Sequence, residues 1–145
     1  MEVVVRDAQE KDIDTIYALG SSDHVFQVSK HIPFYEREEL TEWIKNPKDN
    51  ILCVAADEGE VIGFFFCKVM SWHWAMLDNF YCAPAFRNGK IRSLMTDALI
   101  QRLRQRKVLY LSTLVEEGRI SLGRFLRRQG FSMSKRYEWY EVFIK

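Results

Sequence analysis

The residues with the clearest chemical pattern lie in CAPAFRNGKIRSLM, residues 82–95. A run of strand composition precedes this segment and apolar residues at helical spacing follow it, so it predicts a loop that leads from a strand into a helix. The first N–H groups of a helix have no partner within the helix, and together with the helix dipole they attract an anion. Gly89, Lys90 and Arg92 occupy this helix start, and phosphate is the anion that such a loop favours.

Cysteine and histidine spacing indicates no second site. The cysteines, Cys53, Cys67 and Cys82, each lie in an apolar segment, and an odd number without Cys-x-x-Cys spacing argues against a disulfide framework and a zinc site. We therefore expect buried free thiols. Cys82 as a nucleophile is the alternative, and it would need a base such as His73 to form the thiolate. The histidines show no metal-ligand spacing, so we expect no metal.

Charge is divided unevenly along the chain, although the net charge is only +1. Residues 1–72 hold 7 Lys/Arg and 14 Asp/Glu, whereas residues 73–145 hold 14 Lys/Arg and 6 Asp/Glu. Two solvated surfaces of opposite sign would account for this without any function. The functional alternative is that the basic half holds an anionic ligand and the acidic half attracts a cationic one.

The length of 145 residues and the 48% hydrophobic content predict a single domain, residues 1–145. No apolar stretch approaches the roughly 20 residues that cross a bilayer, and the acidic N-terminus is not typical of a signal peptide. We expect a soluble, cytoplasmic protein that does not bind membranes. The sequence leaves the oligomeric state open, including a homodimer.

The elements that must position the loop alternate between strand and helix patterns. Strand composition occurs at 3–5, 51–56, 61–70, 73–82, 108–115 and 137–145, and the turn composition of 57–60 predicts an antiparallel hairpin. Helical spacing occurs in the residues before Gly20, which predicts the end of that helix, and again in 34–45. It also occurs from Ile91 to Leu103, including Leu94 and Ala98. A last helix is predicted in 121–131, where Gly130 closes it. The order β-α-α-β-β-β-α-β-α-β predicts an α/β (α+β) domain with a mixed sheet.

One longer segment, NFYCAPAFRNGKIRSLMTDALI, resembles the central motif of the GNAT superfamily of acyl-CoA-dependent N-acyltransferases. In that family a strand is followed by proline, an aromatic residue and Arg/Gln-x-x-Gly-x-Gly/Ala before a helix. The match runs from Phe80 through Pro84, Phe86 and Arg87 to Leu99, and the runs VVVRDAQEKDID, EVIGFFF and FLRRQGF resemble other family segments. The resemblance implies a mostly antiparallel central sheet flanked by helices.

The resemblance also implies a site and a reaction: transfer of an acetyl group from acetyl-CoA to an amine of a small molecule or a protein. The backbone of Phe80, Tyr81 and Cys82 would pair with the pantetheine amides, and an N–H there would polarise the thioester carbonyl. The pyrophosphate would bind the backbone N–H groups of the loop formed by Arg87, Asn88, Gly89, Lys90, Ile91 and Arg92.

Acyl transfer also needs a group that accepts a proton, because an alkyl ammonium has a pKa of roughly 10.4. Asp78 is the candidate base, since related acetyltransferases often hold Glu at the matching place. A structural role, bonded to backbone or to an arginine, is the alternative. Glu116 and Glu117 could assist or replace Asp78, and Tyr137 or Tyr140 could protonate the thiolate, although packing in the last strand is the alternative for both tyrosines.

Several features depart from the family pattern or leave the acceptor open. Lys90 and Arg92 stand where the family has Gly and Gly/Ala, and Leu126 stands where many members have a tyrosine. A non-catalytic acyl-CoA-binding module or sensor is therefore the alternative function. A nucleic-acid-binding domain is a third interpretation, and it has no recognised motif, so we expect no nucleic-acid partner. Residues 21–40, where the family varies acceptor specificity, are acidic, and Trp43, Trp72 and Trp74 could line an acceptor pocket or belong to the core.

Overall fold

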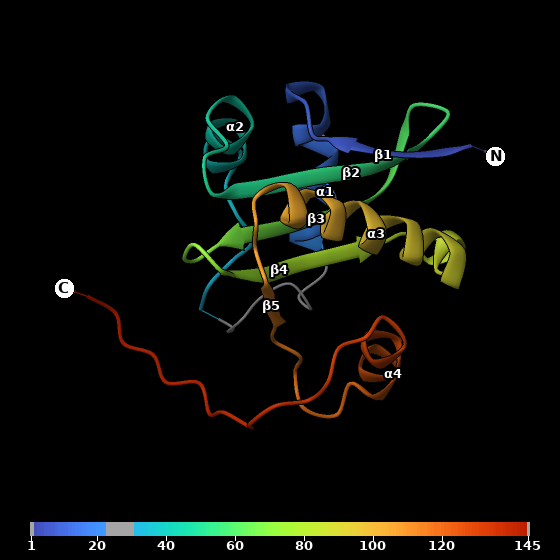
Figure 1. Ribbon diagram of the computed structural model, residues 1–145. Helices are drawn as coiled ribbons and strands as arrows, with labels where there is room; N and C mark the ends of the chain where they lie inside the picture. Colours follow the sequence, from blue (N-terminus) through green and yellow to red (C-terminus); the bar gives the residue numbers. More distant parts are fainter. Residues whose placement is uncertain (1, 23–30, 145) are drawn as a thin grey trace. The chain divides into compact units, whose positions relative to one another are not determined.

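The computed structural model describes residues 2–22 and 31–144, and the chain divides into two compact units, residues 1–114 and 115–145. Within the described part of the first unit lies a five-stranded sheet with the order β1-β2-β3-β4-β5. Neighbouring strands are antiparallel except for β4 and β5, which are parallel. The predicted mixed, mostly antiparallel sheet is confirmed (Figure 1). The strands are β1 (Val3–Asp7), β2 (Asn50–Asp57), β3 (Glu60–Val69), β4 (Trp74–Cys82) and β5 (Tyr110–Thr113).

The β2–β3 hairpin forms where the sequence predicted it. Glu58 and Gly59 form its turn with φ angles of 49° and 87°. Positive φ at both central residues is the geometry of a two-residue hairpin turn, whose twist matches that of the flanking strands. Both strands are buried along nearly their whole length, because helices cover both faces of the sheet.

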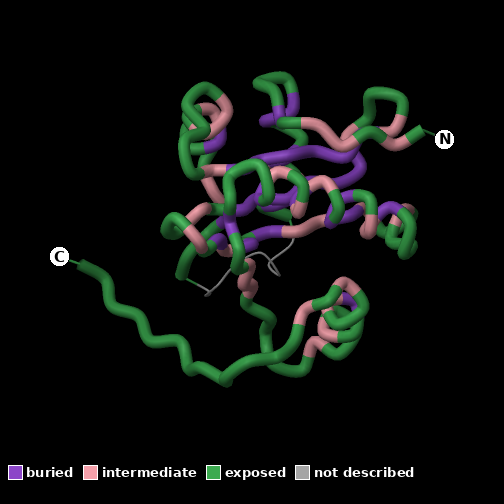
Figure 2. Tube along the Cα trace, viewed as in Figure 1, coloured by how far each residue is buried: buried purple, intermediate pink, exposed green. Residues whose placement is uncertain are grey.

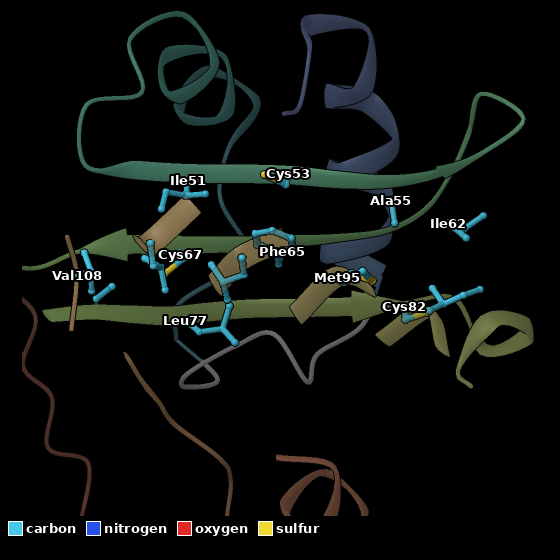
Figure 3. Packing of buried hydrophobic residues seen from close by; sticks show 14 residues of the cluster. Ile51, Cys53, Ala55, Ile62, Phe65, Cys67, Leu77, Cys82, Met95 and Val108 are labelled. Carbon is cyan, nitrogen blue, oxygen red and sulfur yellow. The ribbon is translucent and has the colours of Figure 1, made fainter. Parts of the chain in front are cut away.

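Two hydrophobic clusters lie on opposite faces of this sheet. One face packs against α1 (Ile13–Ser22) and α2 (Arg37–Lys45), and the other packs against α3 (Gly89–Gln105) (Figure 1). Alternation along β3 divides the phenylalanines: Phe64 and Phe66 belong to the first cluster and Phe65 to the second. Figures 2 and 3 show the buried strands and the packing of the α3 side, including Met95.

The prediction for α3 is correct in its extent and nearly correct in its buried face. Ile91, Met95, Leu99 and Leu103 are buried at the expected i, i+4 spacing. Leu94 is 41% exposed, which corrects its assignment to the packed face. The core contact of α3 is thus a single stripe along the helix.

The start of the first unit is held by a partly buried ion pair. A short 3-10 turn, Glu10–Asp12, precedes α1, and Asp12 closes a capping box with Gln9. Arg6 donates two hydrogen bonds to the Asp12 carboxylate, at 2.7 and 3.0 Å. Burial opposes the charge on Asp12, but the hydrogen bonds from Arg6 and Gln9 leave its pKa below the ordinary value.

Gly20 does not end α1, contrary to the sequence prediction, because the helix continues to Ser22. A Cβ at Gly20 would overlap the ring of Phe34, which is 6% exposed. The glycine therefore allows the close approach of the buried Phe34 ring rather than terminating the helix.

The second unit contains α4 (Ile120–Arg128) and a long C-terminal segment. Gly130 has a φ angle of +94°, and its N–H donates to the Arg127 carbonyl. The Phe131 N–H donates to the Leu126 carbonyl. These bonds form a Schellman motif, so the predicted glycine cap is confirmed. The strand predicted at 137–145 is wrong for the described residues up to 144, which have no strand structure. Strand composition alone does not form a strand, since the backbone needs a pairing partner.

Candidate functional site

The chemistry-bearing residues gather where the pairing of β4 changes. The parallel pairing with β5 ends at Leu77↔Thr113, and the Thr113 hydroxyl donates to the Leu77 carbonyl at 2.8 Å. On the other side, the register to β3 shifts between Phe66↔Asn79 and Cys67↔Leu77. Asp78 is therefore the extra residue of a β-bulge, at the same point where β5 stops. Bulges re-aim side chains and occur often beside active sites.

Asp78 lies in surroundings that raise the pKa of its carboxyl. The residue keeps an exposed surface, yet burial of its carboxyl by the surrounding protein raises its pKa above the ordinary value. Asn79 Nδ2 donates to Asp78 Oδ2 at 3.2 Å, and no ion pair to Asp78 occurs within residues 2–22 and 31–144. The alternative of a carboxylate paired with an arginine therefore has no support here, and a raised pKa moves the group toward neutral pH.

The predicted loop contains a 3-10 turn, Pro84–Phe86, and then the N-terminus of α3. Asn88 is the N-cap, and its Oδ1 accepts the Ile91 N–H at 3.0 Å. The N–H groups of Gly89 and Lys90, in the first turn, lie before the first intrahelical acceptors. With a helix of 17 residues behind them, they form the positive end of a full helix dipole.

Gly89 has open space around it, because a Cβ added there would meet no atom within 4 Å. The helix start therefore leaves room for a group that approaches its N–H donors. Lys90 is exposed and carries a positive charge at the same place. An open helix start with a positive charge beside it is an arrangement that favours an anion.

Arg87 reaches back to β4 rather than extending along the helix start. Its Nε donates to the Cys82 carbonyl at 2.7 Å, and its guanidinium lies 5.8 Å from the centre of the Tyr81 ring. The side chain thus joins the loop to the end of β4. The terminal nitrogens of a guanidinium remain available as further donors when Nε is used.

Cys82 has the features of a structural thiol. Cys82 is 5% exposed, and its Sγ donates to the Phe86 carbonyl at 3.1 Å. Burial raises the pKa of the thiol, although the charges of Arg92 and Arg87 oppose this rise. His73 comes just before the start of β4 and Cys82 is the last residue of that strand, so the two residues lie about 30 Å apart along the extended chain. His73 therefore cannot serve as the base for the Cys82 thiol. The arrangement favours a buried thiol over a nucleophile.

Gly63 allows the close contact between β3, β4 and α3 beside this site. It pairs with Cys82, and an added Cβ would lie 2.6 Å from the Tyr81 carbonyl oxygen and 3.2 Å from Met95 Cε. The backbone contact cannot relax by a rotamer change. Gly63 therefore fixes the position of the end of β4 against the helix.

Several other candidate residues belong to the second unit. Glu116 pairs with Arg119 at 3.3 Å and Glu117 with Arg136 at 3.6 Å, both on exposed side chains. The Tyr140 hydroxyl donates to Glu138 at 3.0 Å, and Tyr137 is 76% exposed. Packing of these tyrosines in a last strand is not observed, and their roles in proton transfer stay predictions.

The tryptophans separate into core and surface. Trp43 stacks on Phe66 with ring centres 4.4 Å apart, whereas Trp72 is 79% exposed and Trp74 is 37% exposed, at the end of β4 opposite the loop. Of the segment 21–40 proposed for acceptor specificity, residues 23–30 lie outside the described residues.

One pocket of the described residues lies away from the loop. Its volume is about 380 Å³, and it is lined by the last turns of α3 together with the end of β1, α2 and the start of β2, including Asp7, Trp43, Asn50, Arg102 and Arg106. Arg102 is occupied by Asp7, at 3.1 Å, and Arg106 donates to the Lys48 carbonyl at 2.6 Å. These arginines join the helix end to the sheet, and we assign no chemistry to this pocket.

The described part of the chain holds neither a metal-ligand cluster nor a membrane-spanning helix. No group of three or more His, Cys, Asp or Glu side chains could hold a metal ion. No helix there is long and apolar enough to cross a membrane.

Sequence comparison identifies a family but no curated relative. The model of the acetyltransferase (GNAT) family matches residues 13–131. No curated protein matches the chain.

Solved structures share the fold at low sequence identity. A transcriptional regulator from Bacillus halodurans C-125 is 20% identical with a TM-score of 0.79, covering 97% of this chain and 100% of its own. A ribosomal-protein-alanine N-acetyltransferase from Brucella melitensis is 25% identical with a TM-score of 0.71, covering 89% and 84%. An aminoglycoside antibiotic 6'-N-acetyltransferase from Acinetobacter baumannii is 11% identical with a TM-score of 0.77, covering 99% and 100%.

Proposed function

The chain belongs to the acetyltransferase (GNAT) family, and from this premise we propose that it transfers an acetyl group from acetyl-CoA to an amine of a small molecule or a protein. One observation carries the proposal: β4 ends its pairing with β5 at a bulge occupied by Asp78, and the same strand leads within a few residues to the start of α3. The proposed proton acceptor and the proposed anion site thus belong to one continuous segment.

The residues that would hold the coenzyme are those of the β4 end and the loop. The backbone of Phe80, Tyr81 and Cys82 would pair with the pantetheine amides, because β5 does not continue alongside them. The N–H groups of Gly89 and Lys90 would bind the pyrophosphate, and the open space at Gly89 supports this. The loop side chains that would supply further donors or charge are Arg87, Asn88, Lys90 and Arg92, with Ile91 packed beneath.

Asn88 and Ile91 define how many backbone donors the loop offers. The Asn88 side chain already satisfies the Ile91 N–H, so this donor is not available to a phosphate while the cap is in place. Positive side chains offset such a loss, since charge-assisted bonds to phosphate are stronger than neutral ones. Lys90 and Arg92, which replace the family's small residues, are placed in sequence to do this.

The chemical step assigns one role to Asp78. The amine nitrogen attacks the thioester carbonyl carbon, the new C–N bond forms and the C–S bond breaks, and the thiolate leaves. The Asp78 carboxylate takes the proton that the attacking nitrogen loses, and the thiolate takes a proton from solvent. A carboxyl with a raised pKa accepts this proton more readily than an ordinary one.

The names of two similar structures, a ribosomal-protein-alanine N-acetyltransferase and an aminoglycoside 6'-N-acetyltransferase, make a protein amine and a small-molecule amine both suitable acceptors to test. The acidic balance of residues 1–72 favours a cationic acceptor. We propose that the protein acts in the cytoplasm as a single domain and that it needs no metal.

A non-catalytic acyl-CoA-binding module is the second candidate. It is favoured by the capped Ile91 N–H, by the return of Arg87 to the Cys82 carbonyl and by Leu126 at the place of the family's tyrosine. CoA thiolate is a tolerable leaving group near neutral pH, so loss of a tyrosine need not abolish transfer. Both candidate functions predict that the protein binds acetyl-CoA, and only the acetyltransferase predicts that an added amine releases CoA.

Calorimetric titration with acetyl-CoA and a thiol-release assay together decide between them. The acceptor panel is spermidine, amino acids, an aminoglycoside and a peptide with a free N-terminal alanine. Binding with release of CoA that depends on an added amine supports the enzyme. Binding without release for any amine supports the module, and no binding at millimolar acetyl-CoA contradicts both.

A further inference from the structure

β5 leaves one edge of the sheet open in the described part of the chain. It is the last strand of the order β1-β2-β3-β4-β5, and it pairs only on its β4 side. The backbone N–H and C=O groups of β5 that point away from β4 therefore have no ladder partner within residues 2–22 and 31–144. Such an edge is a template on which a further strand can pair.

Large apolar side chains accompany this open edge. Leu109, directly before β5, is 79% exposed, and Tyr110 and Leu114 are exposed as well. We call β5 together with Leu109 and Leu114 the β5 edge surface. Exposed apolar side chains beside an unpaired strand edge are typical of a site where another polypeptide binds.

The C-terminal arm, which we define as residues 137–144, has the side-chain pattern of a strand but forms no strand in the described residues. Trp139 Nε1 donates to Glu141 Oε1 at 2.9 Å, and the Tyr140 hydroxyl donates to Glu138 Oε2 at 3.0 Å. Both bonds join residues i and i+2, which share one side of an extended chain. The arm is thus already extended, and its residues are exposed (Figure 2). It needs a neighbouring backbone, rather than a new conformation, to become a strand.

We propose that two copies of the chain form a dimer by exchanging arms: the C-terminal arm of each copy pairs as a further strand with the β5 edge surface of the other. This exchange pairs both edges and both arms at once, in the two-fold symmetric arrangement that most homodimers use. The arm belongs to a compact unit, residues 115–145, separate from the unit that holds the sheet, so the unit is exchanged as a whole. The proposal concerns assembly and does not depend on the proposed function.

The C-terminal arm is large enough to hold such a dimer together. It carries four exposed aromatic side chains, Tyr137, Trp139, Tyr140 and Phe143. An aromatic side chain buries roughly 150–250 Å², so the two arms would bury on the order of 1,200–2,000 Å² through these side chains alone. A stable interface between two proteins buries about the same area.

The charges of the two surfaces are complementary. Glu138 and Glu141 make the C-terminal arm acidic, whereas the exposed Arg104 and Lys107 come shortly before the β5 edge surface. Opposite charges favour the pairing of an arm with the edge of the other copy. Like charges disfavour the pairing of one arm with another arm.

One variant on each surface tests the dimer. Tyr140→Pro removes a backbone N–H from the C-terminal arm, and Leu109→Arg places a charge on the β5 edge surface; both side chains are exposed, so neither change disturbs the core. Sedimentation equilibrium should find wild type at twice the 17.2 kDa of the chain at micromolar concentrations. Each variant should raise the dimer dissociation constant by about tenfold or more. Met133→Lys is the control, because Met133 is also exposed but lies outside the arm.

An equimolar mixture of the two variants distinguishes arm exchange from other contacts. In a mixed dimer the intact arm of the Leu109→Arg copy meets the intact edge of the Tyr140→Pro copy, so the mixture should dimerise more tightly than either variant alone. Circular dichroism checks that each variant is folded, and Tyr140→Glu takes the place of the proline variant if that one does not fold.

Three results would overturn the proposal. The first is a wild type that stays monomeric at millimolar concentration, which would leave the arm to its own chain or to a different partner. The second is a dimer that neither variant weakens. The third is a mixture that dimerises no more tightly than the separate variants, which would indicate that arms pair with arms or edges with edges.

Discussion

The two halves of β4 belong to one strand and have different uses. Trp74–Leu77 pairs in register with β3 on one side and β5 on the other, and Ala75 and Leu77 are buried in the core. In the second half, Asp78 is the unpaired residue of the bulge, Asn79–Cys82 pair with β3 in the shifted register, and the β5 pairing has ended. Where β4 is paired on both sides, its backbone groups are used by the sheet. Where the pairing is interrupted, the bulge turns the side chain of Asp78 out of the regular alternation. The chemistry is therefore expected in the second half alone.

The largest effect should come from Asp78→Asn. If the second half of β4 carries proton transfer, this change lowers kcat by about a hundredfold or more, because an amide cannot accept the amine's proton. The affinity for acetyl-CoA should stay near that of wild type. Asp97→Asn is the matched control, since Asp97 is exposed on α3. Equal rates for the Asp78 variant and wild type across the pH range would remove Asp78 from the mechanism.

Gly63→Ala should strain the second half of β4 against α3. The new Cβ would contact the Tyr81 carbonyl and Met95, so we expect a loss of about 1–3 kcal/mol in the free energy of unfolding. The affinity for acetyl-CoA should fall too, because the end of β4 must shift. Urea unfolding and calorimetry measure the two effects.

Gly89→Ala is the comparison for this substitution, since no atom lies within 4 Å of the added carbon. Its unfolding free energy should stay within about 0.5 kcal/mol of wild type. A tolerated Gly63→Ala would show that this end of β4 is not tightly fixed.

Salt should weaken coenzyme binding if the loop that follows β4 receives the phosphates. We expect the Kd for acetyl-CoA to rise roughly tenfold between 50 and 500 mM salt, since exposed charges are screened over about 10 Å at 0.1 M. Lys90→Ala should weaken binding about two- to fivefold and reduce the salt dependence. Isothermal titration at several salt concentrations checks both, and a Kd independent of salt would argue against a phosphate role for these side chains.

The smallest effect should be on thermal stability, and it separates a site carboxyl from a structural one. The pKa of Asp78 is raised, so its stabilising contribution is complete below the ordinary pKa of aspartate and is lost as the pH rises through the raised value. Asp78→Asn should therefore raise the Tm at neutral pH, by about a few degrees at most, and this gain should vanish in acid.

Asp12 should behave in the opposite way, because its pKa is lowered. Its contribution is present above the ordinary pKa and is lost as the pH falls through the lowered value. Asp12→Asn should lower the Tm at neutral pH, and the difference should shrink in acid. Calorimetric scans from pH 3 to 7 test both variants, and the same sign for the two would contradict the distinction.

Local patterns predicted the parts of the fold that depend on local geometry. The stripe from Ile91 to Leu103 gave α3, and the turn at Glu58 and Gly59 gave the central hairpin. The loop before α3 was also found from sequence, because helix starts and their donors are local features. Gly130 as a helix cap belongs to the same class.

Features that depend on distant segments were not predictable in this way. The bulge at Asp78 is defined by the register with β3, and Asn79 is notable only because its amide oxygen is buried without a partner. The sequence predicts a helix end at Gly20, because the contact of Gly20 with Phe34 is not visible in the helix's own residues. The strand expected at 137–145 had the right composition but, through residue 144, no pairing. The roles of the site residues, Asp78 first, remain predictions.

The burial of the three cysteines has a practical consequence for measuring activity. Burial raises the pKa of Cys53 and of Cys67 to about 12, and it raises the pKa of Cys82 as well. Disulfide reagents react with thiolates, so the folded protein should consume almost none of a chromogenic thiol reagent at neutral pH. The colour that develops in a continuous assay then reports free coenzyme A alone, and a burst of protein thiol would itself signal unfolding of the sample.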